Sequence, residues 1–245
     1  MKIKKFLFDN LSTLFYALII AIIIRSLLFQ PFYIPSSSME PTLLVGDRLF
    51  VSKYTYGYSK HSFPFSPNIS NIRFFFKDPQ RGEVIVFKTP TDNRTDYIKR
   101  LIGLPGDEIQ FIDGNLYLNN NQILKTKKNI KNLEVFCGEE VMDVIAYDEK
   151  LPNGYTYTAV YRKEGSFKNS DKYIVPKNHY FFLGDNRDCS KDSRYLNSVG
   201  YVNKLNLVGK ARIIFFSTDK KVGNIFQIWK WFKIIQWNRF FDIIN

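Results

Sequence analysis

The sequence contains few of the residues that build metal sites and disulfide frameworks. It has two cysteines, Cys137 and Cys189, and two histidines, His61 and His179, among 245 residues. A disulfide-rich scaffold is therefore excluded, although the sequence leaves open whether the two cysteines are joined. Neither histidine lies in a cluster with the spacing of zinc ligands, so we expect no metal and no cofactor. A Ser-His-Asp triad would have to use one of these two histidines.

Acidic residues are also scarce relative to basic ones. The chain has 23 Asp and Glu against 35 Lys and Arg, which gives a formal net charge of +12. Such a surplus favours an acidic partner, either a nucleic acid or an anionic membrane surface. The hydrophobic content of 45% excludes a disordered chain. The length suits one elaborated domain or two small ones.

A long apolar run near the amino terminus favours the membrane. Residues 11–29 are almost entirely apolar and long enough to cross a bilayer as a helix. Three lysines precede the run, and basic residues mark the cytoplasmic side of a membrane. We therefore predict a cytoplasmic segment at 1–10, a single transmembrane anchor at 11–29 and an exported remainder. A cleavable secretory signal is the alternative, but no A-x-A-like site closes the run.

The remainder of the chain is mostly short candidate strands punctuated by Gly, Pro and Asn, which indicates a mainly β, antiparallel fold. The strongest candidate strands are 83–87, 97–102, 180–183 and 212–216. Asp113-Gly114 and Asn153-Gly154 predict tight turns between strands. We expect an antiparallel β core at 30–110 and 179–218, interrupted by an inserted β-rich subdomain at 111–178.

Two further segments combine aromatic residues with other signals. The basic, aromatic carboxyl-terminal segment at 224–245 has the composition of an amphipathic helix lying in a membrane interface. The alternative for this segment is a helix that covers the core. Residues 63–78 mix Phe, Pro, Ser and Asn, which suits an irregular loop or a long hairpin with exposed aromatic residues. Whether this loop is a plain surface connection, dips into lipid or grips a substrate is left open.

Three segments contain residues suited to catalysis. Residues 30–43 carry serines between prolines and cannot continue the preceding helix. In the strand predicted at 97–102, alternation places Lys99 on one face with two apolar neighbours. Burial of that face would lower the lysine pKa from about 10.4, which would make the amine a base near neutral pH. The polar loop at 184–194 directly follows a predicted strand, where functional loops are often placed.

Taken together, these segments resemble the bacterial type I signal peptidase, or leader peptidase, family. The resemblance rests on PSSSMEPTLLVGDRLFVSKYTYG at 35–57, RGEVIVFKTP at 81–90, YIKRLIGLPGD at 97–107, GDNRDCSKDSR at 184–194 and LVGKA at 207–211. It covers the anchor and most of the β core, but not the inserted subdomain or the carboxyl-terminal segment.

The resemblance implies a membrane-bound serine endopeptidase that removes signal peptides from exported preproteins by a Ser/Lys dyad. It makes Ser38 the nucleophile and Lys99 the general base. It places the oxyanion between the Ser38 backbone N–H and the Ser36 hydroxyl, and it has Ser190 orient the lysine.

The same resemblance assigns supporting and substrate-binding residues. The supporting charges of the site loop are Asp185, Arg187, Asp192 and Arg194. Ile34, Tyr97 and Ile98 would line pockets for the small side chains at the cleavage site. The implied partners are signal peptides and the lipid bilayer, with no nucleic acid and no obligate protein partner. The implied location is the bacterial inner, cytoplasmic membrane, with the catalytic domain on the outer, periplasmic side.

The chain departs from the family pattern at two places in or after the polar loop. Cys189 stands where the family usually has Asn, and Tyr195-Leu196-Asn197 replaces a typical Trp-Gly. Neither change removes a proposed catalytic group, but both alter the local packing.

Two other classes of protein were weighed against this assignment. A penicillin-recognising enzyme would explain the S-x-x-K match at 217–220, but the chain lacks its S-D-N and K-T-G companions. The second class is an anchored, non-enzymatic, β-rich binding protein. It would leave the ordered segments around Ser38, Lys99 and Ser190 without a function, so the peptidase assignment is favoured.

Overall fold

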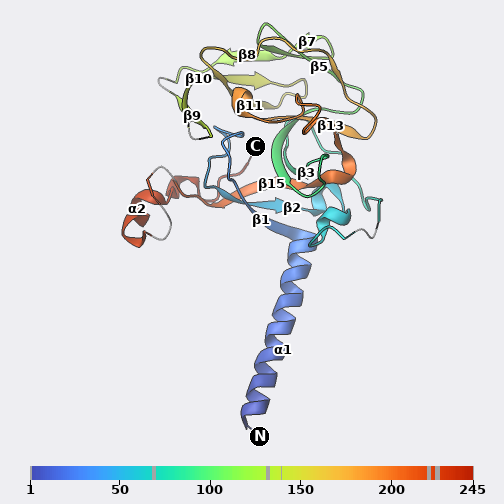
Figure 1. Ribbon diagram of the computed structural model, residues 1–245, viewed down its shortest axis with the longest axis vertical. Helices are drawn as coiled ribbons and strands as arrows, with labels where there is room; N and C mark the ends of the chain where they lie inside the picture. The colour runs from blue at the N-terminus through green and yellow to red at the C-terminus, as the bar shows by residue number, and fades with distance from the viewer. Residues whose placement is uncertain are drawn as a thin grey trace.

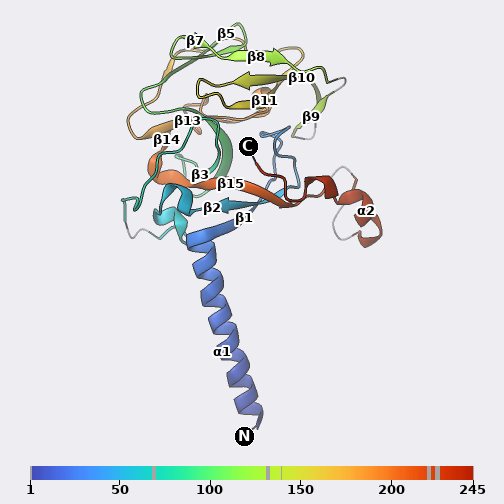
Figure 2. The ribbon, with the colours of Figure 1, turned by 180° about the vertical axis from the view of Figure 1, so that it is seen from behind.

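The molecule consists of a long amino-terminal helix that projects from a β-rich body (Figures 1 and 2). The computed structural model describes residues 2–67, 70–130, 133–138, 140–219, 222–223 and 227–244. The helix α1 (Lys2–Ile23) continues as a π-helical segment, η1 (Ile24–Leu28), and leads directly into the first strand. Because Pro31 follows and cannot donate a helical hydrogen bond, the helix cannot extend further.

The apolar helix is long enough to cross a membrane. Its apolar stretch, Asn10–Leu28, has 19 residues and a mean hydropathy of 2.2, and almost none of it is buried within the protein. The sequence predicted the anchor at 11–29, but Phe29 belongs to the first strand, so the helix ends one residue earlier.

The main sheet has seven antiparallel strands and carries several of the motifs quoted from the sequence. In spatial order its strands are β1 (Phe29–Tyr33), β2 (Arg48–Ser52), β15 (Leu207–Phe216), β3 (Val84–Lys88), β4 (Asp96–Gly103), β13 (His179–Leu183) and β14 (Val202–Asn203). The four strands predicted from the sequence correspond to parts of β3, β4, β13 and β15, and are confirmed. The strand β4 lies between β3 and β13, so its backbone is hydrogen-bonded on both edges and its side chains are held in fixed positions.

Two four-stranded sheets cover the end of the main sheet that is remote from α1 (Figures 1 and 2). One contains β11 (Thr156–Arg162), β10 (Glu140–Lys150) and β8 (Leu124–Lys127), with β9 (Glu134–Cys137) also paired to β10. The other contains β12 (Tyr173–Ile174), β5 (Glu108–Ile112), β6 (Asn115–Leu118) and β7 (Asn121–Gln122). The turn predicted at Asp113-Gly114 joins β5 to β6, and the turn at Asn153-Gly154 joins β10 to β11, as expected.

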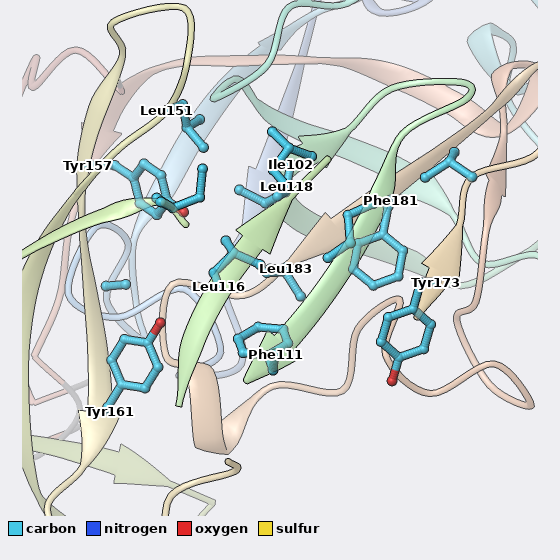
Figure 3. Packing of buried hydrophobic residues seen from close by; sticks show 14 residues of the cluster. Ile102, Phe111, Leu116, Leu118, Leu151, Tyr157, Tyr161, Tyr173, Phe181 and Leu183 are labelled. Atoms are coloured by element: carbon cyan, nitrogen blue, oxygen red, sulfur yellow. The ribbon is translucent and has the colours of Figure 1, made fainter. Parts of the chain in front are cut away.

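A hydrophobic cluster joins these sheets to the main sheet (Figure 3). Ile102 of β4 and Phe181 of β13 pack with Phe111, Leu116 and other side chains of the smaller sheets. Because strand side chains alternate in direction, one face of β4 can supply this cluster while the other face supplies the site described below. The strand that carries the site, β4, is therefore held in place by the packing of its opposite face against the smaller sheets.

The carboxyl-terminal segment is not the continuous helix that its composition suggested. Its described residues form only a short helix, α2 (Trp231–Ile234), between two 3₁₀ turns, η6 (Ile228–Lys230) and η7 (Trp237–Arg239). Isolated β-bridges return the chain to Thr218 and Ile213, which interrupts any longer helix. Large apolar side chains still face solvent here: Trp229, Trp231, Phe232, Trp237, Phe241 and Ile243.

Four short 3₁₀ segments complete the described structure. They are η2 (Tyr54–Tyr56), η3 (Lys60–Ser62), η4 (Arg187–Cys189) and η5 (Lys204–Asn206). The described part of the 63–78 segment is irregular, as predicted, and exposes Phe65, Phe74 and Phe75.

Candidate active site

Ser38 lies in the connection between β1 and β2 and is buried. Backbone hydrogen bonds from Ile34 to Asp47 and from Gly46 to Ile34 close this connection into a compact loop. The Ser38 carbonyl accepts a hydrogen bond from the Asn186 backbone at 3.2 Å. Two segments far apart in the sequence therefore hold the serine between them.

Lys99 extends from the centre of β4 to this serine. Its Nζ and the Ser38 Oγ are hydrogen-bonded, and only 3% of the lysine is exposed. Burial lowers the pKa of Lys99 to about 8, because the ammonium loses its hydration. The Asp192 and Asp185 carboxylates raise this pKa and the Arg194 guanidinium lowers it, but burial outweighs them. About a tenth of the amine is therefore neutral at pH 7, and half of it at about pH 8.

The predicted supporting charges surround this lysine in paired form. Arg194 Nε and Nη2 donate to the two oxygens of Asp192 at 2.8 and 2.9 Å. Asp192 also accepts from the Gly184 backbone N–H at 3.0 Å. Burial raises the pKa of Asp192, but Arg194 more than offsets this, so the pKa lies below its usual value. The 184–194 loop is thus folded around an ionised carboxylate.

The other two supporting charges have partners that the sequence did not reveal. Asp185 accepts from Arg100 Nε and Nη2 at 2.8 and 2.7 Å, and the pair is almost fully buried. Arg187 forms an ion pair with Glu149 of β10, and this pair is also almost fully buried. Neither Arg100 nor Glu149 could be identified beforehand, because each lies in a strand distant in sequence from its partner.

Ser36 and Ser190 lie close to the two central residues. The Ser36 Oγ is 3.4 Å from the Ser38 Oγ. The Ser190 hydroxyl is buried beside Gly184, but it forms no hydrogen bond with Lys99, so its orienting role stays a prediction. A Cβ on Gly184 would lie 2.2 Å from the Ser190 Oγ and 2.4 Å from the Ser38 carbonyl oxygen, so only glycine fits there.

A cavity of about 600 Å³ opens in front of Ser38 and Lys99. The three residues predicted to contact substrate, Ile34, Tyr97 and Ile98, all line it. Ile34 and Ile98 belong to an apolar cluster of the main sheet, which fixes the walls of the cavity. The arrangement can therefore place a nucleophile and its base at the end of an apolar groove.

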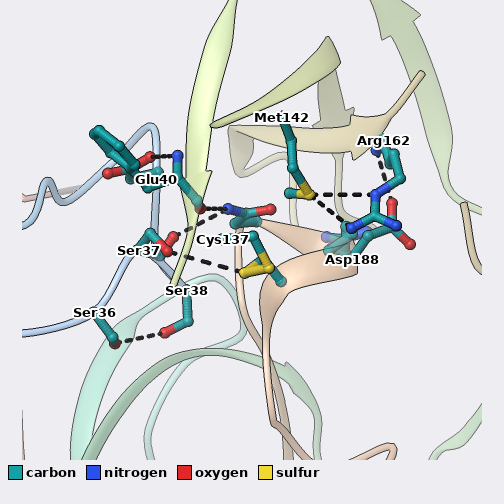
Figure 4. The surroundings of a disulfide bond; sticks show 12 residues. Ser36, Ser37, Ser38, Glu40, Cys137, Met142, Arg162 and Asp188 are labelled. Atoms are coloured by element: carbon teal, nitrogen blue, oxygen red, sulfur yellow. Dashed lines mark hydrogen bonds between the residues drawn. A yellow bond between two sulfur atoms is a disulfide. The ribbon is translucent and has the colours of Figure 1, made fainter. Parts of the chain in front are cut away.

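A disulfide between Cys137 and Cys189 joins β9 to the site loop, which resolves the question that the sequence left open (Figure 4). Ser37 Oγ lies 4.0 Å from the Cys189 sulfur. Asn186 Nδ2 donates to the carbonyls of Ser37 and Phe136, both at 3.2 Å. The disulfide and Asn186 were both missed as site residues, since only the fold brings β9 to this place.

No metal ligand set is found among the residues that the structure describes. They contain no group of three or more His, Cys, Asp and Glu side chains suited to a metal ion. Neither His61 nor His179 lines the cavity of Ser38. The chemistry available at this cavity is therefore that of a serine beside an amine.

Comparisons with known proteins show which family this chain is related to. A family model described as signal peptidase, peptidase S26, matches residues 7–216. A signal peptidase I of Rickettsia typhi is 38% identical over 259 residues, covering 98% of this chain and 95% of the relative. A signal peptidase I of Rickettsia canadensis is 40% identical over 245 residues, covering 92% of this chain and 89% of the relative.

Solved structures were also matched, and the following is one of them. The crystal structure of a signal peptidase I from Enterococcus faecalis is 28% identical and covers 55% of this chain and 97% of that protein, with a TM-score of 0.32. The family model spans most of the chain and the sequence relatives span nearly all of it. The chain therefore belongs to the signal peptidase family, peptidase S26, and is a serine peptidase.

Proposed function

We propose that this protein is a membrane-anchored endopeptidase that cleaves signal peptides from exported preproteins with a Ser38/Lys99 dyad. The observation that carries the proposal is the buried hydrogen bond between the Ser38 Oγ and the Lys99 Nζ. A serine hydroxyl needs a neighbouring base to become a nucleophile, and a desolvated, neutral lysine can serve as that base.

The proposed reaction follows from these positions. Neutral Lys99 takes the hydroxyl proton as the Ser38 Oγ bonds to the scissile carbonyl carbon. The oxyanion is then stabilised by the Ser38 backbone N–H and the Ser36 hydroxyl. The lysine ammonium gives its proton to the departing amine, and the peptide C–N bond breaks. A water, deprotonated by the same amine, then attacks the ester carbonyl carbon. The ester C–O bond breaks, the lysine ammonium returns the proton to the Ser38 Oγ, and the signal peptide leaves with the new carboxylate.

The supporting residues keep this lysine both buried and correctly placed. We propose that Asp192 and Arg194 hold the site loop against β4, with Asp185 and Arg187 anchoring its beginning. Ser190 would orient the amine once substrate is bound. Ile34, Tyr97 and Ile98 would restrict the subsites to small side chains, because these walls are packed into the sheet and cannot easily move.

The membrane topology is the second part of the proposal. The apolar stretch Asn10–Leu28 is exposed over nearly its full length, as expected for a helix surrounded by lipid. The basic amino terminus would remain in the cytoplasm, so the catalytic body would lie on the periplasmic side of the inner membrane. We also retain the division into a catalytic core at 30–110 and 179–218 with an insertion at 111–178 as a prediction.

Cleavage of a purified preprotein tests the dyad. We expect Ser38→Ala and Lys99→Ala each to lower kcat/KM by more than about 1000-fold in detergent. Ser37→Ala is the matched control, because it removes a neighbouring hydroxyl whose side-chain contact is the Cys189 sulfur. Its kcat/KM should fall by less than about tenfold. Near-normal cleavage by either dyad variant would remove the assignment.

A further inference from the structure

A second cavity of about 420 Å³ lies beside the carboxyl end of the membrane helix. It shares only Asp96 with the cavity of Ser38 and Lys99. Tyr58 donates a hydrogen bond to the Leu27 carbonyl at 3.0 Å, and the rings of Tyr54 and Phe29 are in contact. These contacts hold the η2 and η3 region, coloured cyan in Figures 1 and 2, against the end of the helix. The second cavity is therefore placed at the membrane surface.

The charges around this cavity are strongly unbalanced. Arg25, Lys53, Lys88 and Arg94 line it, against the single carboxylate of Asp96. That carboxylate is already paired with Lys88 at 2.9 Å. Within the described ranges of the chain, Arg25, Lys53 and Arg94 form no ion pair. Three cations thus face one space without a carboxylate to neutralise them.

Lys53 is held in this space despite being only 2% exposed. Its Nζ donates to the Ser62 carbonyl at 2.6 Å, which fixes its position. Burial, and after it the nearby charge of Arg25, lower its pKa to about 8, against a smaller raising effect of Asp96. A buried ammonium among other cations is stabilised when an anion binds beside it.

His61 supplies a buried ring nitrogen without a hydrogen-bond partner among the described residues. The side chain is 4% exposed and lines the cavity, and its Nδ1 lies 3.0 Å from the Ser66 Oγ. Among the described residues the Nε2 has no hydrogen-bond partner. Burial lowers the pKa of His61 to about 4, so the ring is neutral at pH 7. In the tautomer in which Ser66 donates to Nδ1, the Nε2 carries the proton and can donate to a ligand oxygen; this tautomer is the one that the proposal below requires.

The wall of the cavity on the other side is apolar. Phe63, Pro64 and Phe65 line it, and the Phe65 side chain is fully exposed to solvent. A free inorganic anion would gain no binding energy from apolar contact with this wall. An amphiphile with a negatively charged head and a hydrocarbon portion matches both the cationic interior and the aromatic rim.

We propose that this cavity binds the phosphate group of an anionic phospholipid, with the hydrocarbon chains lying along Phe63 and Phe65. The phosphate oxygens would accept hydrogen bonds from His61 Nε2 and from Arg94 and Arg25, whose guanidinium groups suit two-point contact with phosphate. The choice of a lipid over free phosphate rests on the proposed membrane anchoring. The bound headgroup would fix the height and tilt of the catalytic body at the bilayer surface.

Because the chain has two histidines, their imidazole NMR signals report directly on the cavity. The full-length protein, labelled with ¹⁵N-histidine and solubilised in detergent, is titrated separately with dihexanoyl phosphatidylglycerol, dihexanoyl phosphatidylcholine and inorganic phosphate. We expect phosphatidylglycerol to shift the His61 signals with saturation and to leave His179 unchanged. Phosphatidylcholine and phosphate should bind at least about tenfold more weakly.

Charge reversal at one lining residue provides the matched comparison. Arg94→Glu should weaken phosphatidylglycerol binding by more than about tenfold, since it replaces an attraction by a repulsion within the cavity. Lys127→Glu makes the same change of charge in β8, at the opposite end of the body (Figure 1), and should alter binding less than about twofold.

The outcomes that would overturn the proposal are distinct. An unshifted His61, equal shifts of both histidines, or equal weakening by the two charge reversals would each contradict a phosphate-binding cavity. Equally tight binding of inorganic phosphate would contradict the lipid as occupant. Preprotein cleavage is measured on the same samples, so loss of the dyad assignment and loss of this cavity assignment can be told apart.

Discussion

Opposing influences set the charge of Lys99. Its complete burial favours the neutral amine, whereas the carboxylates of Asp192 and Asp185 favour the ammonium. The two carboxylates are themselves paired with Arg194 and Arg100, which reduces their effect on the lysine. The result is a pKa of about 8, low enough for a base and high enough to protonate a leaving amine.

The rate of cleavage should therefore depend on pH in one direction. Because the neutral amine is the active form, kcat/KM should rise about tenfold per pH unit below about pH 8 and level off above it. The measurement is kcat/KM for a preprotein between about pH 6 and 9.5, at constant ionic strength. A flat profile across this window would contradict Lys99 as the base.

A control is needed because Lys53 has a similar pKa of about 8. The Lys53→Gln variant should keep the midpoint of the profile near pH 8, even if its activity is lower. His61 does not confuse the result, since its pKa lies at about 4. If Lys53→Gln lost the pH dependence, the titrating group would be Lys53, and Lys99 would no longer be supported as the base.

Gly184 offers a second test at the scale of one residue. Gly184→Ala would force the Ser190 side chain and the Ser38 backbone apart, because the new Cβ would come within 2.4 Å of both. We expect kcat/KM to fall by more than about 100-fold, as expected for a small displacement of catalytic groups. Gly114→Ala is the control: its positive φ strains the turn, but nothing lies within 4 Å of the new Cβ. It should lower stability by about 1 kcal/mol and leave kcat/KM nearly unchanged.

At the scale of elements, the β9 strand is attached to the catalytic loop by several bonds of different kinds. The disulfide joins Cys137 to Cys189, and Asn186 bridges the backbones of Ser37 and Phe136. The Glu40 carboxylate also accepts from the Phe136 N–H at 3.0 Å. Strand β9 therefore supports the loop that carries Ser38.

Removal of the disulfide should lower stability measurably. The bond closes a loop between cysteines separated by 52 positions, and Cys137→Ser should cost about 2–4 kcal/mol of unfolding free energy. Denaturant unfolding in detergent, followed by tryptophan fluorescence, provides the measurement. The double variant Cys137→Ser/Cys189→Ser should resemble the single variant, and reductant should destabilise only the native protein. An unchanged midpoint in reductant would contradict this attachment.

The sequence predicted some elements better than others, for physical reasons. Regular alternation and Asp-Gly turns are local signals, so the strands within β3, β4 and β13 and the β5–β6 turn were predictable. The helix predicted for the carboxyl-terminal segment was wrong, because backbone pairing with Ile213 and Thr218 interrupts it. Such pairing is a tertiary interaction that no local sequence pattern reveals. The partners of Asp185 and Arg187 were unpredictable for the same reason.

At the scale of the whole molecule, a buried ion pair links the catalytic loop to the inserted sheet. Arg187 Nη1 and Nη2 donate to Glu149 at 2.9 and 2.8 Å, and the hydroxyls of Tyr157 and Tyr161 also donate to this carboxylate. Burial raises the pKa of Glu149, but Arg187 and the two tyrosines lower it more, so the net pKa is depressed. Because the folded pKa lies below the unfolded value, this stabilisation is present at neutral pH and is lost as the pH falls through the folded pKa.

Removing the charge of Glu149 should leave Arg187 buried without its counter-ion. We expect Glu149→Gln to lower the free energy of unfolding by about 3–5 kcal/mol at pH 7, and to reduce the loss of stability on acidification. Glu108→Gln is the matched control, since its ion pair with Lys172 is largely exposed and should contribute less than about 1 kcal/mol. Both variants are compared by denaturant unfolding at pH 7 and in mild acid. If the two substitutions cost the same, the inserted sheet is not held to the catalytic loop by this pair, and the hydrophobic cluster around Ile102 and Phe181 must hold it instead.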